Sequence, residues 1–159
     1  MRRILENALS RFGERIGLAL TLDEQGSLSL ALDEIEIGIR MDRAETEVMF
    51  YGIVGSLPDD APDVFHRMLM AANSQAALTD GGSLGYDLED EIVTLTRVHP
   101  IGWITDTTLE ESLDRFATTL RTWQTALRDI AHAGRMPLGA AAGDMPATDA
   151  ADAADWIKL

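Results

Sequence analysis

Residues 63–98, DVFHRMLMAANSQAALTDGGSLGYDLEDEIVTLTRV, change their hydrophobic period partway along. In the first part the apolar side chains fall on one side of a helix, at Val64, Phe65, Met68, Leu69 and Ala72. After two glycines, apolar and polar residues alternate from 84 to 88, and a β-branched run from 92 to 98 follows an acidic turn. The stretch therefore predicts a helix, a turn and a two-stranded hairpin.

The preceding part of the chain alternates with a period of two, which indicates strands. Apolar residues occupy every second position in residues 28–32 and 35–41, and Asp33 and Glu34 form a two-residue link typical of a hairpin. A third strand is predicted over residues 46–54. Its centre, VMFYGIV, is apolar on both faces, so it is either a central strand covered on both faces, which we favour, or a strand with one apolar face for a partner.

Helices are predicted at both ends of this region. The first covers residues 2–16 and ends at Gly17 as a cap. The second begins at Thr107, which forms a capping box with Glu110, and ends near Gly134. Its apolar seam is Leu109, Leu113, Phe116, Leu120, Trp123, Leu127 and Ile130. The chain carries strands that need a cover, so we expect this seam to pack on a sheet rather than in a coiled coil. The predicted fold is α+β, in the order α-β-β-β-α-β-β-α, with helices packed on an antiparallel sheet.

The composition excludes several classes of partner. Among 159 residues, 27 are acidic and 13 basic, giving a net charge of −14. Such a surface repels nucleic acid and anionic membranes, so we expect neither as a partner. The chain has no cysteine, and no apolar run approaches the roughly 18 residues of a membrane span. These features predict a cytoplasmic protein without disulfides.

No motif in the sequence indicates catalysis. His66, His99 and His132 are far apart in the sequence and do not have the spacing of metal ligands. The glycine-rich segment 81–85 precedes a strand, whereas a phosphate-binding loop lies between a strand and a helix. We therefore expect no enzyme activity, no catalytic residue, no metal and no cofactor. A small-molecule enzyme with carboxylate catalysis stays open, and a deep acidic pocket would support it.

The domain is predicted to cover residues 1–134, followed by an acidic, Ala/Asp-rich tail over 135–159 that we expect to be disordered. The tail ends in Trp156, Ile157, Lys158 and Leu159. Three interpretations of this apolar tip remain open: it docks on its own domain, it binds a partner, or it has no role.

The order of elements resembles that of the class I chaperones of bacterial type III secretion, the Tir-chaperone (CesT-like) family. The resemblance covers about residues 2–133. Its most specific part is the helix ending in Leu69, Met70, Ala71, Ala72 and Asn73, then residues 82–87 (GSLGYD) and a strand over 92–97. The tail is longer than many family members carry.

The resemblance implies a homodimer whose cargo is the N-terminal segment of one or more secreted effectors, wrapped around the dimer in extended form. It implies that the helix and strand of residues 63–98 form the dimer interface: Phe65, Met68, Leu69, Ala72, Leu84, Tyr86 and Leu88. Surplus apolar positions on the first helix and on the first three strands are the candidates for cargo binding: Leu5, Leu28, Leu30, Leu32, Ile37, Ile39, Met49, Tyr51 and Ile53.

The secretion ATPase is a further partner that the resemblance implies, because the sequence shows no ATP site of its own. A non-secretory dimeric binding or regulatory module on the same fold is the alternative function.

Overall fold

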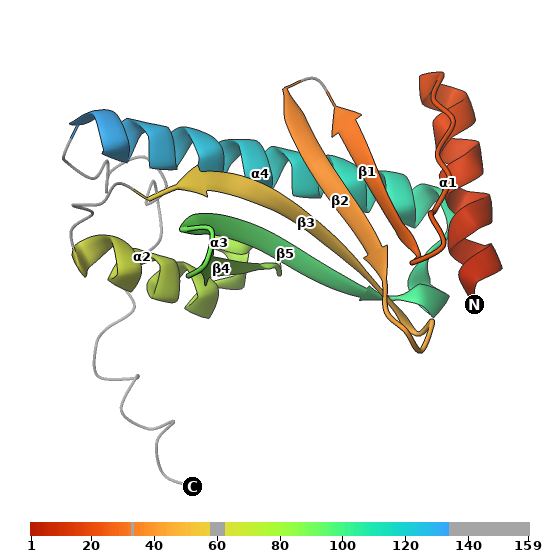
Figure 1. The fold of residues 1–159 in the computed structure, drawn as a ribbon, viewed down its shortest axis with the longest axis horizontal. Helices are drawn as coiled ribbons and strands as arrows, with labels where there is room; N and C mark the ends of the chain where they lie inside the picture. The colour runs from red at the N-terminus through yellow and green to blue at the C-terminus, as the bar shows by residue number, and fades with distance from the viewer. Residues whose placement is uncertain (33, 58–62, 134–159) are drawn as a thin grey trace, which may run out of the picture.

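The computed structural model describes residues 1–32, 34–57 and 63–133, and its elements follow the predicted order with two short additions, α3 and η1 (Figure 1). The elements are α1 (Arg2–Ile16), β1 (Ser27–Leu32), β2 (Ile35–Met41), β3 (Glu47–Ser56), α2 (Asp63–Ser74), α3 (Ala76–Thr79), β4 (Ser83–Asp87), β5 (Ile92–Pro100), the 3₁₀ helix η1 (Ile101–Trp103) and α4 (Asp106–Ala133).

The five strands form one antiparallel sheet in the order β1-β2-β3-β5-β4. The two predicted hairpins, β1–β2 and β4–β5, are confirmed by their registers, which pair Leu28 with Ile39 and Leu84 with Leu95. β3 lies at the centre and pairs with β5, which comes after α2, α3 and β4 in the chain. β1 and β4 are the edge strands.

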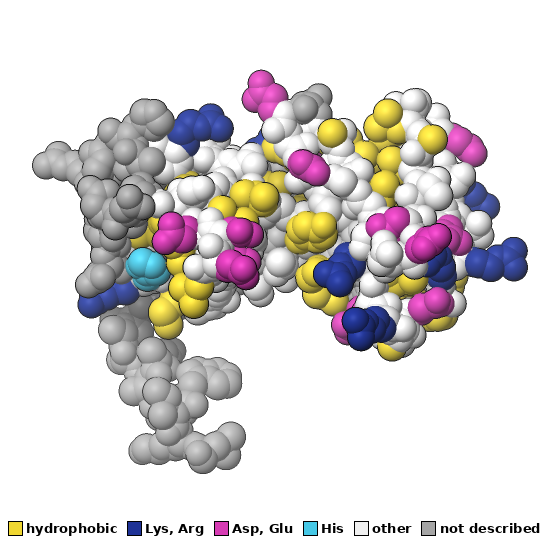
Figure 2. Space-filling model, in the orientation of Figure 1, with side chains coloured by type: hydrophobic (Ala, Val, Ile, Leu, Met, Phe, Trp, Pro, Cys, Tyr) yellow, Lys and Arg dark blue, Asp and Glu magenta, His cyan; other side chains and the backbone are white. Residues whose placement is uncertain are grey.

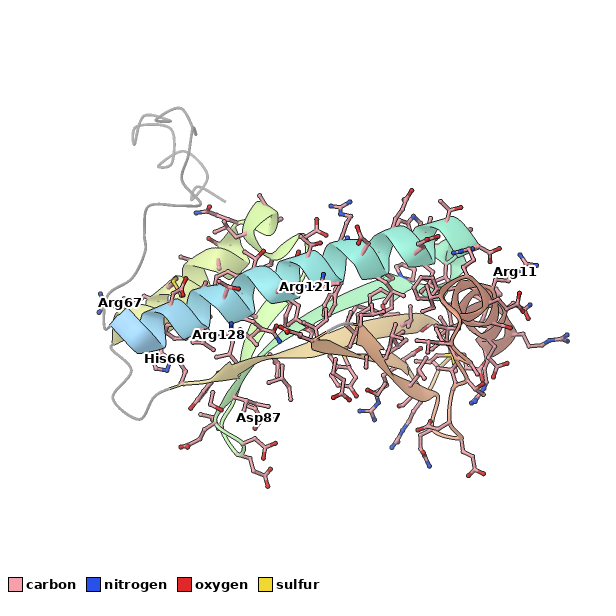
Figure 3. All side chains as sticks on the ribbon, turned by 90° about the horizontal axis from the view of Figure 1, so that it is seen from above. Arg11, His66, Arg67, Asp87, Arg121 and Arg128 are labelled. Atoms are coloured by element: carbon pink, nitrogen blue, oxygen red, sulfur yellow. The ribbon has the colours of Figure 1, made fainter. Side chains whose placement is uncertain are left out.

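Helix α4 runs along one face of the sheet, and α1 packs against the first part of α4 (Figures 1 and 3). The predicted seam of α4 packs on the sheet as expected: Leu109, Leu113, Phe116, Leu120 and Leu127 are all buried. Phe116 meets Phe50 of β3 edge to face, with ring centroids 6.0 Å apart. The core is therefore a single layer between the sheet and α4, closed at one end by α1.

The predicted end of α1 is confirmed, because Gly17 caps it in the left-handed conformation with φ 74°. The predicted start of α4 is wrong by two residues. Thr105 and Thr108 form the capping pair, since each hydroxyl accepts a hydrogen bond from the other residue's N–H, at 3.1 and 2.8 Å. Two threonines in this spacing satisfy the first N–H groups as a threonine–glutamate pair would. Thr105 lies between η1 and the first residue of α4, Asp106.

The prediction that both faces of β3 are covered is also wrong for this protomer. β3 is central, but no helix of the described residues lies over its second face, where Tyr51 is 39% and Ile53 54% exposed. In Figure 3 the labelled Asp87 points away from α4 on this open side.

The tail predicted over 135–159 lies outside the described residues. None of the helices in the described ranges combines the length and hydropathy that a membrane crossing needs.

Candidate protein-binding surfaces

The open face of the sheet carries an apolar patch made by β3 and β5. Met49, Tyr51 and Ile53 alternate with the core residues of β3, and Val98 of β5 lies directly opposite Met49. Ile53 is 54% and Val98 51% exposed, while Met49 is half-buried. Figure 2 views this face and shows apolar side chains over the middle of the sheet. We refer to Met49, Tyr51, Ile53 and Val98 as the open-face patch.

Tyr51 is held in place by a glycine on the neighbouring strand. Gly38 of β2 lies opposite Tyr51, and the tyrosine ring covers it so closely that an added Cβ would collide with ring carbons. The missing side chain lets the ring lie on the backbone of β2. The patch therefore includes an aromatic surface with a defined position.

The edge strand β1 has unpaired backbone groups on its outer side. The Asp23 N–H donates to the Ser27 carbonyl at 2.8 Å, and the Ser27 N–H donates to Asp23 Oδ1 at 2.8 Å. The backbone N–H and C=O of Ser27 therefore point away from β2. Along an antiparallel strand the backbone groups of alternate residues point to opposite sides, so the N–H and C=O of Ser29 and Ala31 point away from β2 as well. The described residues supply no backbone partner for them. This edge can accept another strand.

A groove of about 620 Å³ adjoins the end of this edge, where β1, α1 and α4 meet. Its apolar lining is Phe12, Leu32, Leu113 and Ala117, and its polar lining is Thr107, Glu110, Glu111, Asp114 and Arg121. Arg15 of α1 reaches across to Glu110 of α4, with Nη2 and Oε2 2.6 Å apart. The groove thus has an apolar floor and a charged rim.

The nine predicted cargo residues separate into three groups. Met49, Tyr51 and Ile53 lie in the open-face patch, and Leu28 and Leu32 are half-buried along β1. The other four are at most 1% exposed in the protomer core, where a cargo cannot touch them in this conformation: Leu5, Leu30, Ile37 and Ile39. We assign these four to the core. Strand alternation identifies two faces but does not reveal which one a helix covers.

The predicted dimer residues are also divided by burial. Phe65, Leu69, Ala72 and Leu84 are buried within the protomer, where α2 packs beside β4. Met68 and Tyr86 are half-buried. Leu88, at the β4–β5 turn, is 84% exposed. Met70 of α2, which was not among the predicted dimer residues, is 74% exposed. The outward positions on α2 and this turn are the ones a partner could contact.

Asn73 of α2 closes part of the second sheet edge. Its Nδ2 donates to the carbonyl of Leu84 at 2.8 Å, and its Oδ1 accepts the Leu84 N–H at 2.7 Å. The amide thus takes the place of a neighbouring strand at this position of β4. An additional strand could pair with free backbone groups at the β1 edge. At the β4 edge the Asn73 amide already occupies the backbone groups of Leu84.

A charged cluster that sequence reasoning missed holds three elements together. Asp80, which follows α3 with φ 50°, accepts hydrogen bonds from Arg97 of β5 and Arg115 of α4. Burial of Asp80 favours a higher pKa. The hydrogen bond from Arg115 and the charge of Arg97 outweigh it and hold the pKa of Asp80 below its usual 3.8. Long-range pairs of this kind leave no signal in local sequence patterns.

His99 is buried, with 6% of its surface exposed. It stacks on Trp103 of η1 with ring centroids 5.0 Å apart, and the tilted ring of Phe50 lies 5.2 Å from it. Burial and the nearby Arg97 lower the pKa of His99 below its usual 6.5, although Asp80 acts in the opposite direction. The described residues contain no group of three potential metal ligands, so His99 is best explained as a core residue.

Residues 7–124 match the model of the Tir chaperone protein (CesT) family. The chain belongs to this family. A Tir chaperone from Escherichia coli O111:H− is 30% identical over 110 residues, which cover 69% of this chain and 70% of that protein. The resemblance expected from residues 63–98 is confirmed.

Solved structures share the CesT-family fold of this chain. The ExsC–ExsE complex aligns with a TM-score of 0.69 at 23% identity, over 80% of this chain and 96% of that one. The HopA1–SchA chaperone–effector complex gives 0.63 at 19% identity, over 80% and 95%. YbjN from E. coli, described as a candidate transcription regulator, gives 0.57 at 14% identity, over 79% and 91%.

Proposed function

We propose that this protein is a cytoplasmic chaperone of bacterial type III secretion. It binds the N-terminal segment of one or more effectors and keeps them soluble and ready for secretion, without catalysis of its own. The observation that carries this proposal is the combination, in a CesT-family chain, of an unpaired β1 edge with an apolar sheet face that no described helix covers.

The β1 edge suits an extended cargo. An added strand would pair with the outward groups of Ser29 and Ala31, and its alternate side chains would meet Leu28 and Leu32. Main-chain hydrogen bonds would supply affinity for many sequences, while the apolar contacts would select among them. This division suits a chaperone with one or several cargoes.

The open-face patch offers apolar area beyond the edge. Ordering a flexible segment costs about 2–5 kcal/mol or more, so a cargo must bury a large surface to stay bound. Met49, Tyr51, Ile53 and Val98 provide contacts that do not disturb the core. The net charge of −14 opposes self-association through such a patch when no cargo is bound.

We infer a homodimer that uses the outward side of α2 and the β4–β5 turn. Met70 and Leu88 are the most exposed large apolar residues there, with Met68 and Tyr86 beside them. Because Asn73 blocks part of the β4 edge, the contact would be made by side chains rather than by strand pairing. Met70→Asp should therefore yield a monomer in light scattering without loss of helicity; a dimer would contradict this interface.

The proposed partners are effectors and a second copy of the chain. The secretion ATPase would supply any unfolding work. Nucleic acid is not a proposed partner, because a charge of −14 repels phosphates.

Affinity purification from the source bacterium, with mass spectrometry and light scattering of the eluate, tests this function. We expect a secreted effector on a chaperone dimer, lost when the effector's N-terminal segment is deleted. Secretion of that effector should fall when the chaperone gene is removed. Capture that persists without the segment, or normal secretion in the deletion strain, would contradict the proposal.

A regulatory binding module is the second candidate function, favoured by the fold shared with YbjN. The same purification separates the two. A stable complex with a regulatory protein, and no effector, would support the regulator.

A further inference from the structure

The groove between α1, β1 and α4 combines an apolar floor with a rim that carries three acidic residues and one arginine. Phe12 comes from α1, Leu32 from the end of β1, and Leu113 and Ala117 from the inner side of α4. These side chains come from three elements, and the packing of α1 on α4 holds them together (Figure 3). Leu32 is half-buried, whereas Phe12, Leu113 and Ala117 are only 6%, 1% and 3% exposed, so an entering side chain would pack mainly on Leu32.

The acidic residues of the rim are spaced along α4. Glu110 is paired with Arg15 at 2.6 Å. Glu111 and Asp114 are exposed. Arg115, one turn beyond Glu111, feels the charge of Glu111 but is hydrogen-bonded to Asp80. One basic residue, Arg121, also lines the groove. A ligand that enters beside Glu111 and Asp114 meets negative charge with capacity for a cation.

The groove continues the edge proposed for cargo. Leu32 is both the last residue of β1 and part of the groove lining. A strand added along β1 therefore reaches the groove at its end, and the next cargo side chain can enter. Successive cargo side chains point to opposite sides, so a neighbour of the inserted residue stays near the rim.

We propose that this groove selects cargo segments in which a bulky apolar residue adjoins a lysine or arginine. The apolar side chain packs on Leu32 inside the groove, and the cation lies against Glu111 and Asp114. This inference rests on the proposed function, because it names the chemistry of the cargo that the chaperone binds. The acidic rim rejects an apolar residue flanked by aspartate or glutamate.

The test uses the full chain and a labelled synthetic peptide that carries the N-terminal segment of the captured effector. The double variant Glu111→Lys/Asp114→Lys reverses the rim. The control Glu14→Lys/Asp129→Lys changes two exposed acids outside the groove, and both variants gain the same four charges. Circular dichroism checks that both fold.

We expect the rim variant to bind the peptide about ten-fold more weakly, because two favourable charge contacts become repulsive, and the control to bind within about two-fold of the wild type. A peptide with its basic residues changed to glutamate should bind the rim variant better than the wild type. The difference between wild type and rim variant should shrink in high salt.

Equal binding by the rim variant and the wild type, an equal loss in the control, or an effector segment without an apolar–basic pair would overturn this inference and leave the proposed function standing. A wild-type protein that captures no effector would instead overturn the proposed function, and this inference with it.

Discussion

The two faces of the sheet are built from the same strands but differ in what covers them. Phe50 and Tyr51 are neighbours on β3; Phe50 is fully buried beneath α4, whereas Tyr51 is 39% exposed on the open face. Both faces carry apolar side chains. The covered face holds the protomer together, and the open face has apolar area left for another protein.

This difference implies that stability and binding reside on opposite sides of one strand. Burial of apolar surface contributes about 25 cal/mol per Å², so covered residues account for most of the folding free energy. Open-face residues gain that contribution only when a partner covers them. Substitutions on the two faces should therefore separate unfolding from loss of binding.

The largest effect is expected for Phe50→Ala. Removing a fully buried ring leaves a cavity beneath α4 and should lower the free energy of unfolding by about 3–5 kcal/mol. Tyr51→Ala removes a ring of similar size from the open face and should cost about 1 kcal/mol. Urea denaturation followed by circular dichroism measures both. Similar losses for the two variants would mean that the two faces do not differ as described.

A smaller effect is expected at the β4 edge. Asn73→Ala removes both hydrogen bonds to Leu84 and should lower the free energy of unfolding by about 1–3 kcal/mol. Ser74→Ala is the control and should cost less, because the Ser74 hydroxyl donates one exposed hydrogen bond, to the Ala71 carbonyl in the last turn of α2. If Asn73→Ala matches Ser74→Ala in urea denaturation, the amide does not secure this edge.

His99 should make stability depend on pH. Because burial lowers its pKa, the unfolded chain takes up a proton near pH 6.5 before the folded chain does, so stability falls as the pH drops below 6.5. His99→Phe should remove this part of the decline between pH 6.5 and 5. The pKa of Asp80 is lowered, so the stability that its carboxylate contributes is lost only as the pH falls below about 3.8, outside this window.

Urea denaturation at several pH values measures the effect. Tryptophan fluorescence, to which Trp103 contributes beside His99, gives a second readout. An unchanged slope in His99→Phe would show that another group is responsible.

The smallest effect on stability is expected for Val98→Thr. Threonine keeps the β-branched shape at a half-exposed position, so the free energy of unfolding should change by no more than about 0.5 kcal/mol. Cargo affinity should nevertheless fall, because a hydroxyl replaces a methyl in the open-face patch. A loss above about 1 kcal/mol in urea would place Val98 in the protomer core.

Much of the fold could be predicted because local patterns carry it. The alternation around Asp33 and Glu34 predicted the β1–β2 hairpin, and Gly17 marked the end of α1. The seam from Leu109 to Leu127 predicted that α4 would cover a sheet. Each signal depends only on residues close in sequence.

The binding surfaces could be predicted only in part. Ile37 and Ile53 both alternate with other residues in apolar strands, yet one is core and the other exposed, because coverage depends on where α4 crosses the sheet. Asp80, which contacts Arg97 and Arg115 across three elements, was likewise beyond local patterns. The acidic rim was visible only as a helix start until Leu32 and Phe12 were placed beside it.

Ile37→Asp and Ile53→Asp together give the most direct test of the central claim, that the covered face folds the protein and the open face binds cargo. Each variant is measured by circular dichroism and by recovery of the effector in the affinity purification. We predict that Ile37→Asp fails to fold, because its carboxylate would be buried without a partner, and that Ile53→Asp folds but no longer recovers the effector. A folded Ile37→Asp, or full effector recovery by Ile53→Asp, would contradict the account.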